Sequence, residues 1–332
     1  MSQTLPRRAV LKMGAMAAAG AGLAVLAHTP AANAAAEGDL LVRAGVITDM
    51  HRTTKADTDT RKFSASMPKM QAFVDAMRGI KPAFVVELGD FVDTLSAGTD
   101  PLKNLAQIET LFTSLPCAHY HVLGNHDFDN LKRNEMLDNI RNTGIPQRQT
   151  WYSWDADGVH FIVLDADYTP KGYRPYDMNT PEDTFWTWTD TIIPPQELEW
   201  LKADLQKTRL PVILFSHQTL DRVDEQDHNI KNASAVRAML EASGKVLAVI
   251  SGHDHQGGYA NIKGIHYVVM NGNVGVSDTR SWKATSAADG MDTRADNQYG
   301  VLEVYACGKG DYRIVLNGYG RQPSYVMRRT LA

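Results

Sequence analysis

Residues 82–93 read PAFVVELGDFVD, and this stretch carries the pattern that decides the fold. An apolar run leads directly into Gly89-Asp90, as a buried strand does where it ends in a turn. Four other clusters of acids, histidines and an amide also follow apolar runs: Asp49-Met50-His51, Gly124-Asn125-His126-Asp127, Ser216-His217 and Gly252-His253-Asp254-His255. Because open α/β sheets bind ligands beyond the carboxyl ends of their strands, the five clusters are expected to form one site.

Strand and helix patterns alternate along the chain. Apolar runs that read as strands lie at residues 40–48, 82–88, 119–123, 160–164, 211–215 and 246–250. Helical spacing of apolar residues occurs at Met67, Met70, Phe73, Val74 and Met77, and again over residues 102–115. Segments that alternate as antiparallel strands do are 264–270, 299–305 and 311–316. This order predicts an α/β fold with a largely parallel core, in one catalytic domain over residues 37–332.

The composition limits the class of protein. The chain has 332 residues, of which 43% are hydrophobic and 22% charged, as in soluble globular proteins. A formal net charge of −4 gives no general attraction to nucleic acid or to an anionic membrane. A small phosphate-bearing substrate would therefore be attracted by local charge, above all by bound metal. No oligomeric state is assigned from the sequence.

The N-terminus has the features of an export signal. Arg7-Arg8 with Leu11-Lys12 resembles a bacterial twin-arginine signal, and an Ala-rich apolar run covers residues 13–27. Ala32-Asn33-Ala34 offers a cleavage site, so residues 1–34 are interpreted as a signal peptide. We expect a periplasmic or secreted protein with no membrane insertion after cleavage, and an uncleaved membrane anchor is the alternative.

The cysteines and two irregular stretches leave alternatives open. Cys117 and Cys307 are expected to be buried free thiols, with a disulfide as the alternative. Residues 165–194 are rich in aromatic side chains and form either a flap over the core or a wall of the substrate pocket. Residues 277–298 are polar, and we expect a disordered loop there, with a functional loop as the alternative.

The ligand types indicate a centre with two metal ions. No cysteine stands in the five clusters, and acids with imidazoles suit Mn, Fe or Zn. Two cations about 3.5–4 Å apart need a bridging ligand and can hold a hydroxide between them. Asp90 is the natural bridge because a carboxylate has two oxygens. The neutral amide of Asn125 would add a ligand without repelling a phosphate.

Taken together, the five clusters resemble the full motif set of the calcineurin-like metallophosphoesterases, in order and across the mature chain. The resemblance implies a four-layer αββα sandwich with mixed sheets and the metal site at the carboxyl ends of the strands. It implies one metal ion held by Asp49, His51, Asp90 and His255, and a second held by Asp90, Asn125, His217 and His253. His126 matches the catalytic histidine of the family, and Asp93 matches the acid that orients it.

Residues 252–259, 264–266, 299–304 and 151–154 are similar to the manganese-dependent ADP-ribose/CDP-alcohol diphosphatases. The resemblance to the metallophosphoesterases implies hydrolysis by in-line attack of hydroxide on phosphorus. The narrower likeness and the aromatic-rich stretch 165–194 favour a diester or diphosphate over a monoester. The alternatives are a phosphomonoesterase, a nuclease and a non-catalytic metal-binding homologue. A nuclease is not favoured because the sequence shows no basic stripe, and there is also no arginine cluster to clamp a terminal phosphate.

Overall fold

Strand β2 (Phe84–Glu87) confirms the expectation from the opening stretch, since all four of its residues are buried. The computed structural model describes residues 38–331 apart from 59, 179–186, 225 and 276–296. β2 pairs in parallel with β1 (Asp39–Ile47) on one side and β3 (Ala118–His121) on the other. The three strands therefore end at the same edge of the sheet.

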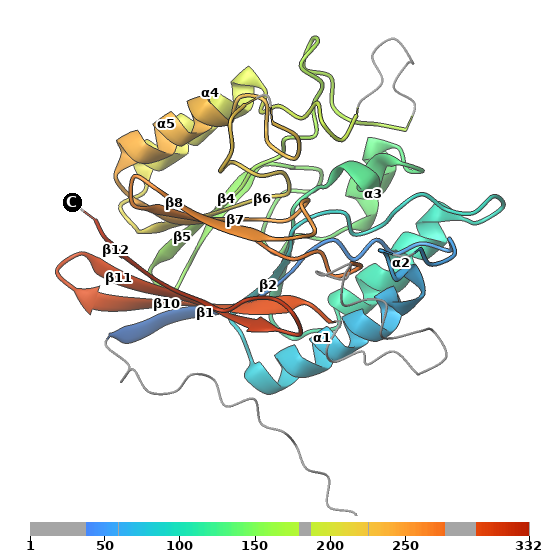
Figure 1. The fold of residues 1–332 in the computed structure, drawn as a ribbon, viewed down its shortest axis with the longest axis horizontal. Helices are drawn as coiled ribbons and strands as arrows, with labels where there is room; N and C mark the ends of the chain where they lie inside the picture. Colours follow the sequence, from blue (N-terminus) through green and yellow to red (C-terminus); the bar gives the residue numbers. More distant parts are fainter. Residues whose placement is uncertain (1–37, 59, 179–186, 225, 276–296, 332) are drawn as a thin grey trace, which may run out of the picture. The chain divides into compact units, whose positions relative to one another are not determined.

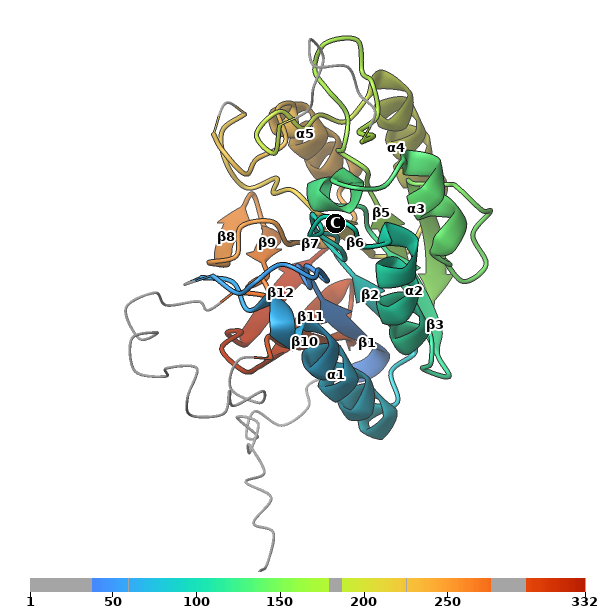
Figure 2. The same ribbon diagram turned by 90° about the vertical axis from the view of Figure 1, so that its right-hand side faces the viewer.

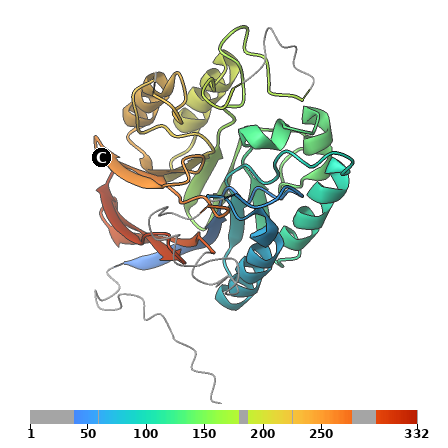
Figure 3. The same ribbon diagram turned by 45° about the vertical axis from the view of Figure 1, so that its right-hand side comes forward.

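The other half of this first sheet is antiparallel. Its strands are β10 (Tyr299–Gly308), β11 (Asp311–Tyr319) and β12 (Tyr325–Thr330). β10 pairs with β1, which gives the order β12-β11-β10-β1-β2-β3. Figure 3 shows the red strands lying beside the blue β1. The sequence predicted β10 and β11 as antiparallel strands but not β12.

The second sheet has the order β4-β5-β6-β7-β9-β8. Its strands are β4 (Tyr152–Ala156), β5 (Val159–Val163), β6 (Val212–Ser216), β7 (Val246–Ser251), β8 (Gly258–Ile262) and β9 (Ile265–Val269). The four inner strands run parallel, and the two edge strands are antiparallel to their neighbours. Residues 264–270 were expected to form an antiparallel strand, and this was only half right. β9 pairs antiparallel with β8 but in parallel with β7. Since all five residues of β9 are buried, the strand belongs to the parallel core.

Helices cover the outer face of each sheet. They are α1 (Ser66–Ile80), α2 (Pro101–Phe112), α3 (Arg133–Asn139), α4 (Pro195–Lys207) and α5 (Ala233–Ser243). Figure 1 shows α4 and α5 on one side of the paired sheets and α1 on the other. Figure 2 shows α2 next to β2 and β3, with α3 above α2. α1 buries Met70, Phe73 and Met77 completely, as its apolar spacing predicted. In α2, Asp100 caps the start by accepting the backbone N–H groups of Leu102 and Lys103.

Three hydrophobic clusters hold the layers together. The central cluster joins both sheets face to face and includes Val46, Phe84, Phe161 and Phe215. A second cluster packs α1, α2 and α3 on the first sheet, and a third packs α4 and α5 on the second. The structure thus confirms the αββα sandwich with mixed sheets.

Three further expectations concern the ends and the cysteines. Cys117 and Cys307 form no disulfide with each other, and both are half-buried. The expected signal peptide lies outside the described residues, as does most of the polar stretch 277–298 with Arg280, Trp282, Lys283 and Arg294. No helix in the described part of the chain is long and apolar enough to span a bilayer.

Candidate metal centre

The predicted ligands lie just beyond the ends of five strands. Asp49 and His51 follow β1, Asp90 follows β2, and Asn125 follows β3. In the second sheet, His217 follows β6, while His253 and His255 follow β7. All of these residues except His255 are buried. The strand ends of both sheets thus bring together side chains up to 206 residues apart along the chain, from position 49 to position 255.

The backbone at these strand ends adopts left-handed conformations that non-glycine residues rarely take. Asp49, His51, Asp90 and His253 have φ values of 53°, 45°, 54° and 68°. Hydrogen bonds hold the loops in place: Asp49 N–H donates to Gly89 O at 3.0 Å, and His51 N–H donates to Asp90 O at 2.8 Å. Such backbone strain persists only where the surrounding structure over-determines it, as it does at many functional sites.

One glycine is required by close approach. A Cβ atom at Gly124 would lie 2.2 Å from the backbone nitrogen of Asp90. Any larger residue would therefore displace the loop that carries Asp90. This is the physical reason for a glycine at position 124.

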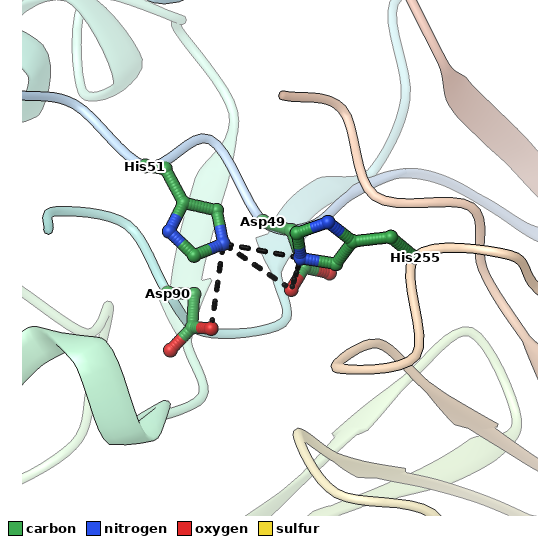
Figure 4. A group of neighbouring side chains, drawn as sticks. All are labelled: Asp49, His51, Asp90 and His255. Atoms are coloured by element: carbon green, nitrogen blue, oxygen red, sulfur yellow. Dashed lines mark hydrogen bonds and ion pairs between the residues drawn. The ribbon is translucent and has the colours of Figure 1, made fainter. Parts of the chain in front are cut away.

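The first cluster contains Asp49, His51, Asp90 and His255, and Figure 4 shows their ligand atoms facing one another. His51 Nε2 lies 3.2 Å from His255 Nε2 and 3.5 Å from Asp90 Oδ2. Asp49 Oδ1 lies 3.1 Å from His255 Nε2 and 3.8 Å from His51 Nε2. These four residues are the set that the sequence assigned to one metal ion.

The second cluster contains Asp90, His217 and His253. His217 Nε2 lies 3.2 Å from Asp90 Oδ2 and 3.2 Å from His253 Nδ1. Asp90 Oδ2 therefore faces imidazoles of both clusters, while Asp90 Oδ1 accepts the backbone N–H of His126 at 2.8 Å. The carboxylate is held by one oxygen and offers the other to both clusters.

The charges in the two clusters suit cation binding. Burial alone would raise the pKa of Asp49 and of Asp90, but the surrounding histidines outweigh it and hold both pKa values below their usual range. Burial, aided by the charge of His217, lowers the pKa of His253. His217 behaves in the opposite way, because Asp90 and Asp49 outweigh its burial and raise its pKa to about 10. Its proton must leave when a metal binds there.

Hydrogen bonds from outside the clusters fix which nitrogen of two histidines faces inward. His217 Nδ1 donates to the carbonyl of Leu88 at 2.7 Å. His51 Nδ1 bonds to Asp93 Oδ2 at 2.9 Å. In both rings the Nε2 lone pair is thereby directed toward the centre, as in metal-binding histidines generally.

The position of Asp93 corrects one expectation. Asp93 was expected to orient His126, but its nearer oxygen lies 3.7 Å from His126 Nδ1, which is outside hydrogen-bond range. The bond to His126 Nδ1 comes instead from Asp129 Oδ2, at 2.8 Å. Residues 125–128 form a 3-10 helix, in which side chains three positions apart lie above one another. That spacing was the signal in the sequence that could have identified Asp129.

Two cations at the rim were also missed. Lys55 Nζ lies 3.3 Å from Asp93 Oδ1, and Arg61 Nη1 lies 3.5 Å from Asp93 Oδ2. Both residues come from the segment between β1 and α1, far from Asp93 in sequence. This pair of cations was not visible in the sequence because Lys55 and Arg61 meet at Asp93 only in the fold.

Trp188, in the aromatic stretch 165–194, lies at the rim of the centre. The ring of Trp188 lies 4.7 Å from that of His228 and 6.0 Å from that of His253. Trp188 is 42% exposed, whereas Tyr176 is buried. The stretch therefore combines both readings, a covering of the core and a rim of the centre. Phe185 and Trp186 lie outside the described residues.

Residues 42–257 match the model of the calcineurin-like phosphoesterases, which is about two thirds of the chain. The chain belongs to this family. It is a metal-dependent phosphoester hydrolase, as the motif set predicted.

Known proteins similar to this calcineurin-like phosphoesterase support the narrower likeness. The manganese-dependent ADP-ribose/CDP-alcohol diphosphatase of Xenopus tropicalis is 24% identical over 284 residues, which cover 69% of this chain and 83% of that protein. The protein of the same name from Bos taurus is 24% identical, with 74% and 79% covered. Among solved structures, a dimetal phosphatase from Danio rerio shares the fold with a TM-score of 0.63 and 20% identity, covering 89% of this chain and all of that one.

The residues present fit the two metal ions of a dimetal phosphoesterase. Both side-chain amide atoms of Asn125 and the Nε2 atom of His253 are buried without a hydrogen-bond partner among the described residues. Buried polar groups are normally satisfied, so the carbonyl oxygen of Asn125 has the character of a metal ligand. For His253, the nitrogen that faces the second cluster is Nδ1, at 3.2 Å from His217 Nε2. Together with the carboxylates and imidazoles of the two clusters, they form a donor set for Mn, Fe or Zn.

Proposed function

We propose that this chain hydrolyses a small phosphodiester or diphosphate substrate at a centre of two metal ions. The observation that carries the proposal is the position of Asp90 Oδ2, which lies 3.5 Å from His51 Nε2 and 3.2 Å from His217 Nε2 and so is shared by two ligand clusters. The names of the similar diphosphatases support a substrate with a diphosphate bond.

The residues divide into two sets of ligands. Asp49, His51, Asp90 and His255 would hold one ion, and Asp90, Asn125, His217 and His253 would hold the other. When bound, such a pair supplies a hydroxide at neutral pH and neutralises charge on the phosphate oxygens. Manganese is the ion that the names of the relatives indicate.

His126 is placed to handle the proton of the leaving oxygen. Its Nδ1 is bonded to Asp129, which leaves Nε2 as the atom available to the substrate. Burial alone would lower the pKa of His126, but the carboxylates of Asp90, Asp129 and Asp93 outweigh it and raise the pKa to about 9. The imidazolium form can donate its Nε2 proton to an oxygen that gains negative charge as its bond to phosphorus breaks.

An activity panel with metal reconstitution tests the proposal. The full chain would be stripped of metal, reloaded with Mn, Fe or Zn, and assayed on ADP-ribose, CDP-choline, cyclic AMP, a glycerophosphodiester, bis-p-nitrophenyl phosphate and p-nitrophenyl phosphate. We expect metal-dependent turnover with diphosphates or diesters ahead of the monoester. A preference for the monoester would make the chain a phosphomonoesterase, and no turnover with any metal would favour a non-catalytic homologue.

We further propose that the chain is exported as a folded protein, on the basis of Arg7-Arg8 and the apolar run after them. Replacing the pair by Arg7→Lys and Arg8→Lys should retain the protein inside a bacterial host with a twin-arginine system. Unchanged appearance of the double variant in the periplasm would reject this assignment.

A further inference from the structure

Asp93 anchors two cations beside the candidate centre. The Asp93 side chain is only 1% exposed, yet Lys55 Nζ approaches its Oδ1 at 3.3 Å and Arg61 Nη1 its Oδ2 at 3.5 Å. The two cations themselves are 38% and 32% exposed, so their ends reach solvent. They project from the rim while the acid that holds them is buried.

These cations lie on the side of the centre where His126 stands. The Asp93 carboxylate that pairs with them also bonds to His51 Nδ1 at 2.9 Å and lies 3.7 Å from His126 Nδ1. Lys55 and Arg61 are therefore separated from the proposed proton donor by one carboxylate group. His126 Nε2 faces the proposed substrate, and the two cations stand one carboxylate away from the other nitrogen of this ring.

The charge on this part of the rim is not balanced. Within the described part of the chain, Asp93 is the one carboxylate within 4.0 Å of either cation. The nearby Asp57 accepts hydrogen bonds from Ser64, and Asp129 is bonded to His126 and Thr94. Two cations thus share a single carboxylate that already serves a histidine, which leaves positive charge available to an anion.

The opposite rim contrasts with this arrangement. Near His253, Arg222 Nη2 pairs with Asp254 Oδ2 at 2.5 Å and Arg222 Nε lies 3.6 Å from Asp221 Oδ1. The cation there is matched by two acids. Of these two groups of cations, only the pair beside His126 outnumbers the acids that hold it.

The backbone holds the Arg61 segment against the centre. Arg61 forms a β-bridge with Gly275, and Lys62 N–H donates to Val274 O at 2.8 Å. The carbonyl of Arg61 accepts the N–H of Thr58 at 3.0 Å. The backbone of Arg61 is thus held by these contacts, which lowers the cost of ordering its side chain around a ligand.

We propose that Lys55 and Arg61 form the subsite for a second phosphate, the one that leaves, so that the preferred bond is the diphosphate linkage of a diphosphate diester. This rests on the proposed function. A guanidinium and an ammonium group both bind phosphate oxygens through charge-assisted hydrogen bonds.

The reaction uses water as its co-reactant. The water oxygen forms a bond to the attacked phosphorus, and the bond from that phosphorus to the bridging oxygen breaks. The electron pair of the broken bond stays with the bridging oxygen on the leaving phosphate. The products are two phosphomonoesters, and the protons of the water pass to the products or to solvent. Lys55 and Arg61 would stabilise the charge that the leaving phosphate gains.

The test compares two substrates in the Mn-loaded full chain. ADP-ribose loses a phosphate-bearing leaving group, whereas bis-p-nitrophenyl phosphate loses an uncharged nitrophenol or its anion. The measured quantity is the ratio of kcat/KM on ADP-ribose to kcat/KM on bis-p-nitrophenyl phosphate. Arg61→Ala should lower this ratio about ten- to a hundredfold, as expected for one charge-assisted hydrogen bond, and Lys55→Ala should lower it in the same direction.

Two further variants serve as controls. Arg61→Lys keeps the charge without the planar fork and should recover part of the ratio. Arg78→Ala removes an exposed arginine of α1 that pairs with Asp75, and it should leave the ratio as it is in the wild type.

The outcomes separate the subsite from the proposed function. An unchanged ratio in Arg61→Ala and Lys55→Ala, or an equal fall on both substrates, would overturn the subsite. The subsite proposal would also be rejected if the wild type hydrolysed the bis-ester but no diphosphate. The protein would then be a phosphodiesterase. If the wild type hydrolysed neither substrate with any metal, the proposed function itself would fail.

Discussion

His126 Nδ1 and Asp129 Oδ2 are 2.8 Å apart. This pair sets the orientation of a histidine that belongs to neither of the two ligand clusters described above. Asp129 also accepts the hydroxyl and backbone N–H of Thr94, so its carboxylate is itself fixed. Asp93, three residues beyond Asp90, bonds to His51 instead. The two acids therefore contact different histidines: Asp129 the proposed proton donor, and Asp93 a proposed metal ligand.

Asp129→Asn should lower kcat without loss of metal. The amide cannot stabilise the His126 imidazolium, and loss of such a supporting carboxylate costs about 10- to 100-fold in activity. The loss should be larger on an alkyl ester than on a nitrophenyl ester, because only the poorer leaving group needs its proton. Steady-state kinetics with the two esters measures this. An equal loss on both would show that Asp129 acts through general structure.

His126→Ala should retain both metal ions and lose about 10²- to 10⁴-fold in kcat on poor leaving groups, the range typical of a lost general acid. Elemental analysis gives the metal content, and initial rates on an alkyl diester give kcat. His119→Ala, at a half-buried histidine outside the described clusters, is the matched control and should keep its activity. Full activity of His126→Ala would refute the assigned role.

Asp90→Ala should lose metal, because Asp90 is, among the described residues, the carboxylate that belongs to both clusters. We expect the content to fall from about two ions per chain to fewer than about one. Asp254→Ala is the control: this acid lies between two candidate ligands in sequence but pairs with Arg222. If Asp90→Ala bound metal as the wild type does, the bridge would be assigned wrongly.

His121 should make stability depend on pH. Its two nitrogens lie 2.8 Å from Glu87 and 3.1 Å from Glu109. Burial alone would lower its pKa, but the two glutamates outweigh it and raise the pKa to about 10. An unfolded histidine has a pKa of about 6.5. The stabilisation is therefore fully present below about pH 6.5 and is lost as pH rises through the folded pKa.

Urea unfolding at pH 7 and at pH 10 measures this effect. At pH 7, His121→Gln should lower the free energy of unfolding by about 3 kcal/mol, since it removes one partner of a buried charged group. The difference between wild type and variant should shrink at pH 10. A difference that stayed constant between the two pH values would show that packing, and not charge, is responsible.

Much of the fold and of the centre could be predicted from the sequence because the relevant signals are local. Apolar runs such as residues 82–88 show where strands lie, and the polar residue that follows each run shows what stands at its end. Asp90, His217 and His253 were assigned in this way, and the structure brings them within reach of one another. The spacing at Met70, Phe73 and Met77 predicted the buried face of α1 for the same reason.

Tertiary structure alone decided the contacts between side chains from separate segments. The sequence placed Asp93 near the centre, but the packing of β1 against β2 determined that it bonds to His51, and the 3-10 turn after β3 gave His126 to Asp129. The tertiary structure likewise brought Lys55 and Arg61 to Asp93. In the chain, Lys55 is 38 residues and Arg61 is 32 residues before Asp93. The local pattern of apolar residues determines where a strand ends and which side chain follows it. The hydrogen-bond or ion-pair partner of that side chain depends on how the loops of the two sheets meet in space.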